Sequence, residues 1–306
     1  MIKLLLGGSP CTFWSISRTE GRETQPSGLG WELYKNYVVA KEKFKPDYFL
    51  YENNESAAPA IQTAIENTLG VKLLHINSSL FSAQNRKRIY GTNIKVAAYP
   101  LVNKGLTVCD IIEQEAEEEN LAHLTAFNGK ENSTERKATT ERIGVIGKGG
   151  QGERVYSIYG KSVTLTGNGG GRGAKTGLYL INGKVRKLTP IECERLQTLP
   201  DNYTAAVSNA QRYKGLGNGW TAEVIIHILQ GALRNVPKDE EIVVLSMYDG
   251  IGTGRYCLDK MGFTNVKYYA YEIDTYAKQV ALSNYPDIIQ MGDAFQVQHP
   301  DWTIGY

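Results

Sequence analysis

The segment Ile2–Cys11, IKLLLGGSPC, begins with an apolar run and ends with a glycine turn and one cysteine. We predict a buried strand over the apolar run, Ile2 to Leu6. A thiol at the carboxyl end of a parallel strand faces the crevice where open α/β sheets bind ligands, and paired glycines allow another backbone or a base to approach closely. Cys11 is therefore a candidate nucleophile, although the commonest fate of a free cysteine is that of a small buried hydrophobic residue.

Two further segments place polar side chains where strands are expected. The run from Asp47 to Tyr51 predicts a second buried strand, which leads into Glu52-Asn53-Asn54. Between Ser82 and Tyr90 the residues alternate, so that Gln84, Arg86 and Arg88 are expected on one face. Helical spacing predicts helices over 31–43 and 57–69.

A fourth segment has the pattern of a nucleotide-type cofactor site. The strongly β-type run Ile242–Tyr248 ends in Asp249-Gly250-Ile251-Gly252-Thr253-Gly254, which is expected to open a helix. The next predicted strand, 266–271, ends in Glu272, and an acid at that place can bind ribose hydroxyls. The glycine pattern alone also fits a hydride-transfer dehydrogenase or an ordinary strand-to-helix turn. Against a dehydrogenase, the rest of the chain offers a cysteine, an acid and two arginines on strand ends.

Composition narrows the class of protein. The chain has 306 residues, enough for about two domains. Charged residues make up 22% of it and the formal net charge is +2, which argues against a disordered chain or a polybasic tail. The four cysteines stand apart with no C-x-x-C pair, which argues against a zinc site and a disulfide scaffold. No apolar stretch approaches membrane-spanning length. We therefore expect a soluble cytoplasmic protein without a bound metal.

From about Asn103 the character of the sequence changes. The acidic run Glu113–Glu119 is expected to form a solvated helix face. Short predicted strands with glycine turns follow between residues 144 and 181, including one over Ser162–Thr166. A small β-rich domain with cations among its glycines suits a phosphate backbone. Its cations are Lys148, Arg154, Lys161, Arg172 and Lys175.

Motifs along almost the whole chain resemble those of the DNA (cytosine-5) methyltransferases. The similar segments are, in chain order, Gly8-Ser9-Pro10-Cys11, Glu52-Asn53-Asn54, Gln84-x-Arg86-x-Arg88, Arg186 through Asp201, and Tyr213-Lys214-Gly215-Leu216-Gly217-Asn218.

The order of the motifs departs from the family. The cofactor motifs, Tyr248–Gly252, Glu272 and Gly292-Asp293, close this chain, whereas in the family they come first. Joining the end of the chain to its start would restore the usual order, so the chain resembles a circularly permuted member. Three positions also depart from the pattern: Asn54 in place of valine, Gly219 in place of another small residue, and Tyr248 in place of phenylalanine.

The resemblance implies the architecture. The expected fold class is α/β, with a Rossmann-like S-adenosylmethionine-dependent methyltransferase sheet and a smaller β-rich target-recognition domain, circularly permuted. Residues 1–102 would form the first part of the catalytic domain, 103–217 the recognition domain and hinge, and 218–306 the second, cofactor-binding part. Segment Arg142–Ser157 is similar, nearly residue for residue, to the recognition domain of a member that methylates the inner cytosine of G-C-G-C. That target, or a site containing it, is therefore implied.

The resemblance also implies chemistry for four side chains. Cys11 would add as a thiolate to carbon 6 of cytosine, because carbon 5 becomes a useful nucleophile only after the ring loses its aromaticity. Glu52 would hold or protonate ring nitrogen 3. Arg88 would bind the base carbonyl oxygen, and Arg86 would support the cysteine and that pocket. The cytosine must be flipped out of the duplex to reach these groups.

Further residues would bind cofactor and DNA. Gln151 would fill the gap left by the flipped base, Arg154 would read guanine in the major groove, and Thr164 would hold a phosphate. The DNA-binding set also includes Ser15 and, on the polar loop up to Gly30, Ser17. The residues implied to bind S-adenosylmethionine are Pro10, Leu29, Asn218, Gly219, Trp220, Tyr248, Asp249, Gly250, Ile251, Gly252, Glu272, Ile273 and Asp293.

The expected partner is double-stranded DNA, with S-adenosylmethionine as cofactor, no metal and no membrane. We expect a monomer in the cytoplasm of a bacterial or phage-infected cell, either within a restriction-modification system or alone. Two other functions stay open: a catalytically silent DNA-binding homologue and an RNA cytosine methyltransferase on the same scaffold. Intact Cys11, Glu52 and Arg88 argue against the first, and the sizeable recognition domain favours duplex DNA over RNA.

Overall fold

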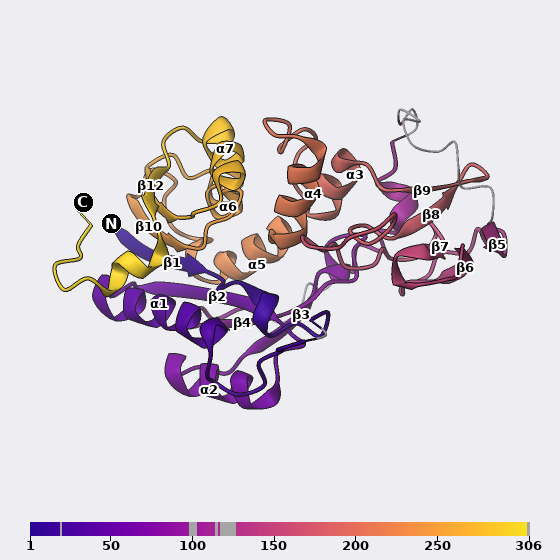
Figure 1. The fold of residues 1–306 in the computed structure, drawn as a ribbon. Coiled ribbons are helices and arrows are strands. Elements are labelled where there is room, and N and C mark those ends of the chain that lie inside the picture. The colour runs from indigo at the N-terminus through magenta and orange to yellow at the C-terminus, as the bar shows by residue number, and fades with distance from the viewer. Residues whose placement is uncertain (19, 98–102, 114–115, 117–126, 305–306) are drawn as a thin grey trace. The chain divides into compact units, whose positions relative to one another are not determined.

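The computed structural model describes residues 1–18, 20–97, 103–113, 116 and 127–304. They belong to two compact units, each made of segments far apart in the chain (Figure 1). The first unit takes Met1–Ile76, Lys87–Ala97 and Ile225–Tyr306, and the second takes Asn77–Arg86 and Ala98–Val224. The first and last segments of the chain therefore belong to the same unit.

The first unit is built on a seven-stranded sheet. Its strands are β1 (Ile2–Gly7), β2 (Tyr48–Asn54), β3 (Leu74–Asn77), β4 (Lys87–Thr92), β10 (Ile242–Met247), β11 (Val266–Tyr271) and β12 (Ile289–Gly292). Their order is β12-β11-β10-β1-β2-β4-β3. Neighbours from β12 to β2 run parallel, and β4 runs antiparallel to β2. The central pair, β1 and β10, places the beginning of the chain beside a strand of its last segment.

Helices cover both faces of this sheet. All six residues of β10 are buried, and such a continuous apolar strand needs cover on both sides. Figure 1 shows α1 (Leu29–Phe44) and α2 (Pro59–Leu69) on one face, and α6 (Thr253–Lys260) and α7 (Thr275–Asn284) on the other. Helix α5 (Ala222–Leu233) belongs to this unit from Ile225 onward. Because neighbouring strands from β12 to β2 run parallel, their carboxyl ends lie at one shared edge of the sheet.

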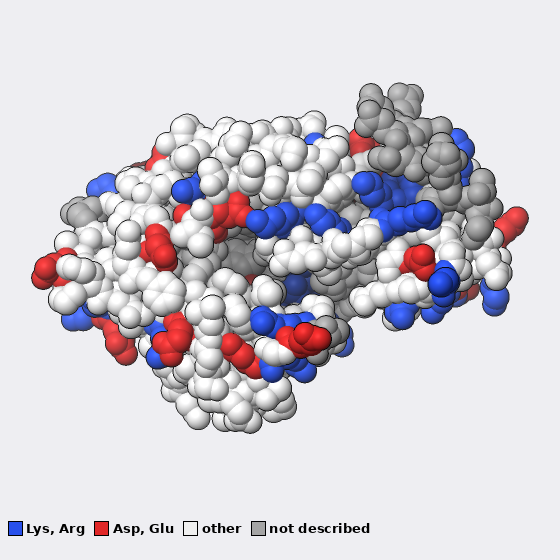
Figure 2. Space-filling model, in the orientation of Figure 1, with Lys and Arg blue, Asp and Glu red and all other residues white. Residues whose placement is uncertain are grey.

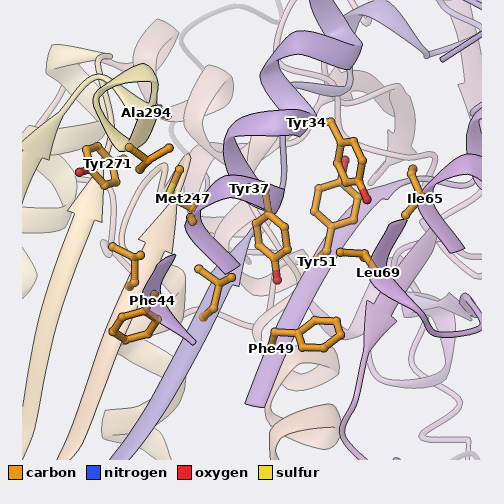
Figure 3. Close-up of a cluster of buried hydrophobic side chains, with 14 of the residues drawn as sticks. Tyr34, Tyr37, Phe44, Phe49, Tyr51, Ile65, Leu69, Met247, Tyr271 and Ala294 are labelled. Carbon is orange, nitrogen blue, oxygen red and sulfur yellow. The ribbon is translucent and has the colours of Figure 1, made fainter. Parts of the chain in front are cut away.

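Aromatic side chains fill the core between α1 and the sheet. Figure 3 shows Tyr34 and Tyr37 of α1 facing Tyr51 of β2. The ring centroid of Tyr51 lies 5.0 Å from that of Tyr34 and 5.0 Å from that of Tyr37. Offset and edge-on aromatic pairs at this distance add to the free energy of burial. The core therefore fixes α1 over the strands that carry the predicted site.

The second unit contains a five-stranded sheet with a small apolar core. Its strands are β5 (Phe127–Gly129), β6 (Arg142–Ile146), β7 (Arg154–Tyr156), β8 (Leu178–Ile181) and β9 (Lys184–Lys187), in that spatial order. Helices α3 (Pro190–Leu196) and α4 (Asn209–Asn218) follow. Short 3-10 helices are η1 (Cys11–Phe13) and η5 (Ala294–Gln298) in the first unit, and η2 (Ser78–Leu80), η3 (Val108–Asp110) and η4 (Gln151–Glu153) in the second.

The predicted α/β class is confirmed, and so are the strands at both ends of the chain. Two local predictions are wrong. The alternation over Ser82–Tyr90 is not one strand, because β4 begins at Lys87 and the preceding residues belong to the second unit. Ser162–Thr166 is not a strand, because its backbone bonds to the segment before β4: Asn85 N donates to Ser162 O at 3.0 Å. Of the acidic run Glu113–Glu119, most lies outside the described residues. The permutation and the functional domain boundaries stay predictions.

Candidate active site and cofactor site

Asn53, near the end of β2, fixes the turn that precedes Cys11. Its Nδ2 donates to the Ser9 carbonyl at 3.0 Å, to Ser9 Oγ at 3.3 Å and to the Tyr51 hydroxyl at 2.9 Å. The Ser9 and Tyr51 hydroxyls lie 2.7 Å apart, and all three side chains are buried. Cys11 then opens the 3-10 helix η1 and is partly exposed. The thiol thus follows a turn whose backbone is held in one place.

Gly8 brings this turn against Glu52. A Cβ atom on Gly8 would lie 2.8 Å from the Glu52 carbonyl oxygen and 3.0 Å from Glu52 Oε2. Contacts that short do not occur with a real side chain, so this approach of turn and carboxylate requires glycine. The cysteine turn and the predicted acid are therefore neighbours at the carboxyl edge of the sheet.

Arg88 of β4 pairs with this acid. Its Nε lies 3.0 Å from Glu52 Oε1, and the side chains are 9% and 12% exposed. A charge-assisted hydrogen bond from an arginine fixes the orientation of a nearly buried carboxylate. The ends of β1 and β2 and the start of the antiparallel β4 thus place the cysteine turn, Glu52 and Arg88 at one edge of the sheet.

The segment after the cysteine is tied back to α1. Glu23 accepts from Trp14 Nε1 at 3.1 Å and from the Gly30 amide at 3.1 Å. Trp14 also packs on Trp31 of α1, with ring centroids 6.4 Å apart. The predicted DNA-binding residues Ser15 and Ser17 lie near the start of this segment, and their hydroxyls are 2.8 Å apart.

The glycine loop after β10 is held by Glu272 at the end of β11. Glu272 Oε2 accepts from the Gly250 amide at 2.9 Å, and Oε1 accepts from the Ile273 and Asp274 amides at 2.8 Å each. Gly250 and Gly252 have φ angles of 65° and 79°, which glycine adopts without strain. This is the strand, glycine turn and acid expected from the sequence.

The carboxyl group of Asp249, in this loop, is shielded from water. Its Oδ1 accepts from the Ser246 and Tyr268 hydroxyls at 2.7 Å each. Among the described residues its buried Oδ2 has no hydrogen-bond partner. Burial raises the pKa of Asp249 to about 6, aided by the charge of Glu272 and opposed by the two hydroxyl donors.

The residues at this edge fit a nucleoside-type cofactor. Each Glu272 oxygen is engaged by backbone amides, and a carboxylate offers about four acceptor positions, so ribose hydroxyls can still bind. Asp293, after β12, is exposed and accepts from the Phe295 amide at 3.0 Å. Leu29 and Ile273 are apolar yet 52% and 70% exposed. Pro10 is exposed, Ile251 is buried, and the remaining predicted cofactor residues, Asn218, Gly219 and Trp220, belong to the second unit.

Arg86 lies in the second unit and bonds to backbone carbonyls there. Its guanidinium donates to the carbonyls of Leu165 at 3.1 Å, Gly217 at 3.2 Å and Gly219 at 2.8 Å, and the side chain is 3% exposed. Gln84 Oε1 accepts from the Leu165 amide at 3.0 Å. Arg86 therefore joins the segment before β4 to two later motifs. Its predicted role toward the cysteine stays a prediction.

Lys161 corrects one expectation about the cationic surface. It is 1% exposed, and its Nζ donates to the carbonyls of Ser79 at 2.7 Å and Ser82 at 3.0 Å. Burial lowers the pKa of this lysine. Lys161 cannot meet a phosphate from this position, because the carbonyls before β4 take its donors.

The other predicted DNA-binding residues of this unit differ in exposure. Gln151 and Arg154 are exposed, as are the cations Lys148 and Arg172. Figure 2 shows lysine and arginine side chains gathered on the second unit in the face drawn. Thr164 is half-buried, and its hydroxyl donates to the Asn85 carbonyl at 2.6 Å.

Several groups that shape the site were not singled out from the sequence. Asn53 stands out in the sequence only as part of the Glu52-Asn53-Asn54 motif, and its contact with Ser9 joins residues 44 positions apart. Period-two alternation in β2 puts Asn53 on the buried face with Tyr51, which is the signal that could have found it. Helix α4 is not predicted from the sequence, because its residues are mostly polar and include two glycines.

The described ranges contain neither a candidate metal site nor a candidate membrane span. There, no group of three or more His, Cys, Asp or Glu side chains is placed to hold a metal ion. Within the same ranges, no helix is both long and apolar enough to cross a membrane.

Comparison with known proteins adds independent findings. Residues 1–233 match the family description C-5 cytosine-specific DNA methylase. Type II methyltransferase M.HhaI of Haemophilus parahaemolyticus is 34% identical over 255 residues, which cover 76% of this chain and 75% of that protein. M1.ScrFI of Lactococcus lactis subsp. cremoris is 28% identical over 264 residues, covering 78% and 64%. A solved structure of a Spodoptera frugiperda DNMT2 mutant aligns over 74% of this chain and 78% of its own, with a TM-score of 0.45 and 15% identity.

Proposed function

This chain belongs to the C-5 cytosine-specific DNA methylases, and from that premise we propose that it methylates the inner cytosine of G-C-G-C in duplex DNA through a covalent adduct on Cys11. As a member of this family, the chain is an S-adenosylmethionine-dependent methyltransferase with type II methyltransferase relatives. The observation that supports the proposal best is the Glu52–Arg88 ion pair at the edge of the sheet where the turn before Cys11 lies against Glu52.

Cys11 is the nucleophile in this mechanism. Its thiolate forms a bond to carbon 6, and the electron pair of the ring double bond moves toward carbon 5. The Asn53 amide supports this role because it holds the Ser9 carbonyl, two residues before the thiol, at 3.0 Å. A fixed turn presents the sulfur in one place, so little ordering remains when the base arrives.

Glu52 and Arg88 handle the charge pushed into the ring. Glu52 holds ring nitrogen 3 by a shared proton, and Arg88 donates to the carbonyl oxygen of the base. Both groups thereby stabilise charge that develops as the thiolate adds. Their 3.0 Å ion pair supports this assignment, because it sets the carboxylate in place before the base binds. After transfer, carbon 5 loses its proton and Cys11 leaves.

Residues at the ends of β10, β11 and β12 hold the cofactor, which supplies an electrophilic methyl group. Glu272 takes the ribose hydroxyls, Asp293 the adenine amine, and the Tyr248 ring packs against the cofactor. The space beside Gly250 is open to the cofactor, because no protein atom lies within 4 Å of the position that a Cβ atom would take there.

The second unit reads the DNA. Gln151 replaces the flipped cytosine, and Arg154 contacts guanine in the major groove. The exposure of both residues supports these roles. The segment Arg142–Ser157, which contains both, is the part of the chain whose resemblance points to G-C-G-C. Ser17 and Thr164 position the duplex through its backbone.

The chain is a circular permutation of the usual family order. Three observations support this proposal: the family match ends at residue 233, the cofactor loop lies beyond it, and β10 pairs directly with β1. The Met1 amino group also forms an ion pair with Glu240, just before β10. A chain that starts at Asp239 and continues from Tyr306 through a short linker to Met1 should fold and methylate DNA. Loss of folding in that chain would count against the permutation.

The function is tested by transfer of labelled methyl from S-adenosylmethionine to a duplex with one G-C-G-C site. A duplex with the site scrambled and an RNA of the same sequence serve as comparisons. We expect transfer to the first duplex alone. Equal transfer to both duplexes would overturn the target, equal transfer to RNA would favour an RNA methyltransferase, and binding without transfer would favour a silent DNA-binding protein.

A further inference from the structure

Tyr248 has a backbone conformation that side chains seldom adopt. It follows β10 directly, and its φ angle is +61°. This left-handed region suits glycine, and a bulky residue persists there only where its surroundings fix it. The ring of Tyr248 belongs to the proposed cofactor site, so the contacts that fix this residue bear on cofactor binding.

The hydroxyl of Tyr248 is bonded on both sides by α1. It donates to the Leu33 carbonyl at 2.7 Å and accepts from Asn36 Nδ2 at 3.0 Å. Burial raises the pKa of this hydroxyl to about 12, so it keeps its proton and remains a donor throughout the working pH range. The hydroxyl thus anchors the far end of the ring while the strained backbone anchors the near end.

Asn36 extends the contact to a third element. It is fully buried, and its Oδ1 accepts from Gln298 Nε2 of η5 at 2.6 Å. A buried amide whose donor and acceptor are both used in this way resists rotation, because any other orientation leaves a polar group unpaired. The hydroxyl, Asn36 and Gln298 therefore form one hydrogen-bonded chain from β10 through α1 to η5.

We propose that this chain of Tyr248, Asn36 and Gln298 is a positioning device that holds the Tyr248 ring in the orientation that binds S-adenosylmethionine. The proposal rests on the proposed function and goes beyond it, because the roles taken from the family concern the ring alone. Phenylalanine, the family's usual residue here, could not form these bonds. The hydroxyl is thus this chain's own means of ordering the ring before the cofactor arrives, which lowers the cost of binding.

The test is equilibrium binding of S-adenosylmethionine and S-adenosylhomocysteine to the full chain by calorimetry. Tyr248→Phe keeps the ring and removes the hydroxyl, and Asn36→Leu removes the amide at similar volume. We expect each change to weaken binding about fivefold, the effect of one hydrogen bond. Tyr285→Phe is the matched control: its hydroxyl lies 3.3 Å from Asp259, at the end of α6 remote from the glycine loop. It should bind both ligands as the unchanged protein does.

The double variant distinguishes a chain of bonds from two separate effects. Because Tyr248 and Asn36 act through the same ring, we expect the double variant to bind about as weakly as either single variant. Losses that multiply, or Tyr248→Phe binding as tightly as Tyr285→Phe, would overturn the proposal. If the unchanged chain bound neither ligand, the proposed function would fail instead. Urea unfolding of each variant measures its stability separately. A variant that is as stable as the unchanged chain but binds more weakly has lost affinity through the orientation of the ring.

Discussion

Arg88 Nε lies 3.0 Å from Glu52 Oε1, although the two residues are not directly opposite each other in the sheet. Arg88 of β4 is opposite Asn54, and Glu52 of β2 is opposite Tyr90. The ion pair is therefore a diagonal one across two antiparallel strands, within reach of a long side chain. Each charge has little access to water, so each depends on the other.

Removing one member of this pair should be costly. We expect Arg88→Met to lower the free energy of unfolding by about 3 kcal/mol, because it removes the arginine that pairs with the nearly buried Glu52 carboxylate. Methyl transfer in a single turnover should fall at least about a hundredfold, the effect of losing one donor to developing charge. Urea unfolding and a quenched transfer assay check the two values. Stability within about 1 kcal/mol of the unchanged chain would contradict this dependence.

Asn53 offers a test of the turn that carries the thiol. Asn53→Leu removes the donor to the Ser9 carbonyl, to Ser9 Oγ and to the Tyr51 hydroxyl, so we expect a loss of about 2 kcal/mol in stability and slower adduct formation. The neighbouring Asn54→Val is the matched control, because valine is the usual residue there in the family. It should cost less than about 0.5 kcal/mol. Equal effects of the two substitutions would show that Asn53 does not hold the turn.

Asp249 gives the protein a distinctive pH dependence. Its pKa rises from an ordinary value of about 4 to about 6 on folding. Below pH 4 the carboxyl is protonated in both states. Between pH 4 and 6 the unfolded chain loses the proton while the folded chain keeps it, so stability falls as the pH rises, by about 3 kcal/mol in all.

Asp249→Asn removes that titration while keeping an acceptor for Ser246 and Tyr268. The difference in stability between this variant and the unchanged chain should therefore change across pH 4 to 6, with the variant gaining at the higher pH. Urea unfolding at several pH values measures it. A difference that stays constant over this range would show that the carboxyl is ionised at its ordinary pKa.

Arg86 should act as an internal tie of the second unit. Arg86→Met removes a donor from the carbonyls of Leu165, Gly217 and Gly219, of which Gly219 keeps a hydrogen bond from Gln197 Nε2 at 3.2 Å. A buried carbonyl left unpaired costs about 1 kcal/mol or more. We expect faster hydrogen exchange at the Leu165 and Thr166 amides, measured by mass spectrometry. Arg172→Met, which removes an exposed cation, should leave exchange there unchanged. Unchanged hydrogen exchange in Arg86→Met would show that Arg86 does not hold these segments together.

The parts of the structure that sequence predicts best are those set by local pattern. The apolar runs before Cys11 and Asp249 are strands, and Glu272 ends the next strand as the glycine pattern requires. Because the parallel strands β1 and β2 end at one edge, the approach of the cysteine turn to Glu52 follows from strand order once the motifs are placed. Arg88 reaches the same edge because β4 runs antiparallel to β2.

Contacts between distant segments lay beyond that reach. Period-two alternation places Arg86 and Arg88 on one face of a single strand. In the structure, β4 begins only after Arg86, whose guanidinium donates to carbonyls some 80 to 130 residues later in the chain. Lys161 stands in a polar, glycine-flanked stretch typical of a surface, and only the carbonyls of Ser79 and Ser82 explain its burial. The bond from Asn36 to Gln298 spans 262 positions. No local pattern carries such information.

The most direct test of the account is whether Cys11 bonds to the target base. A duplex with 5-fluorocytosine at the inner position of G-C-G-C should trap the adduct after methyl transfer, because carbon 5 then has no proton to lose and Cys11 cannot leave. Digestion and mass spectrometry of the full chain, incubated with this duplex and S-adenosylmethionine, would locate the bond. We predict the modified nucleotide on the peptide that contains Cys11, and none with the Cys11→Ala variant. Methyl transfer by Cys11→Ala, or an adduct on another cysteine, would contradict the account.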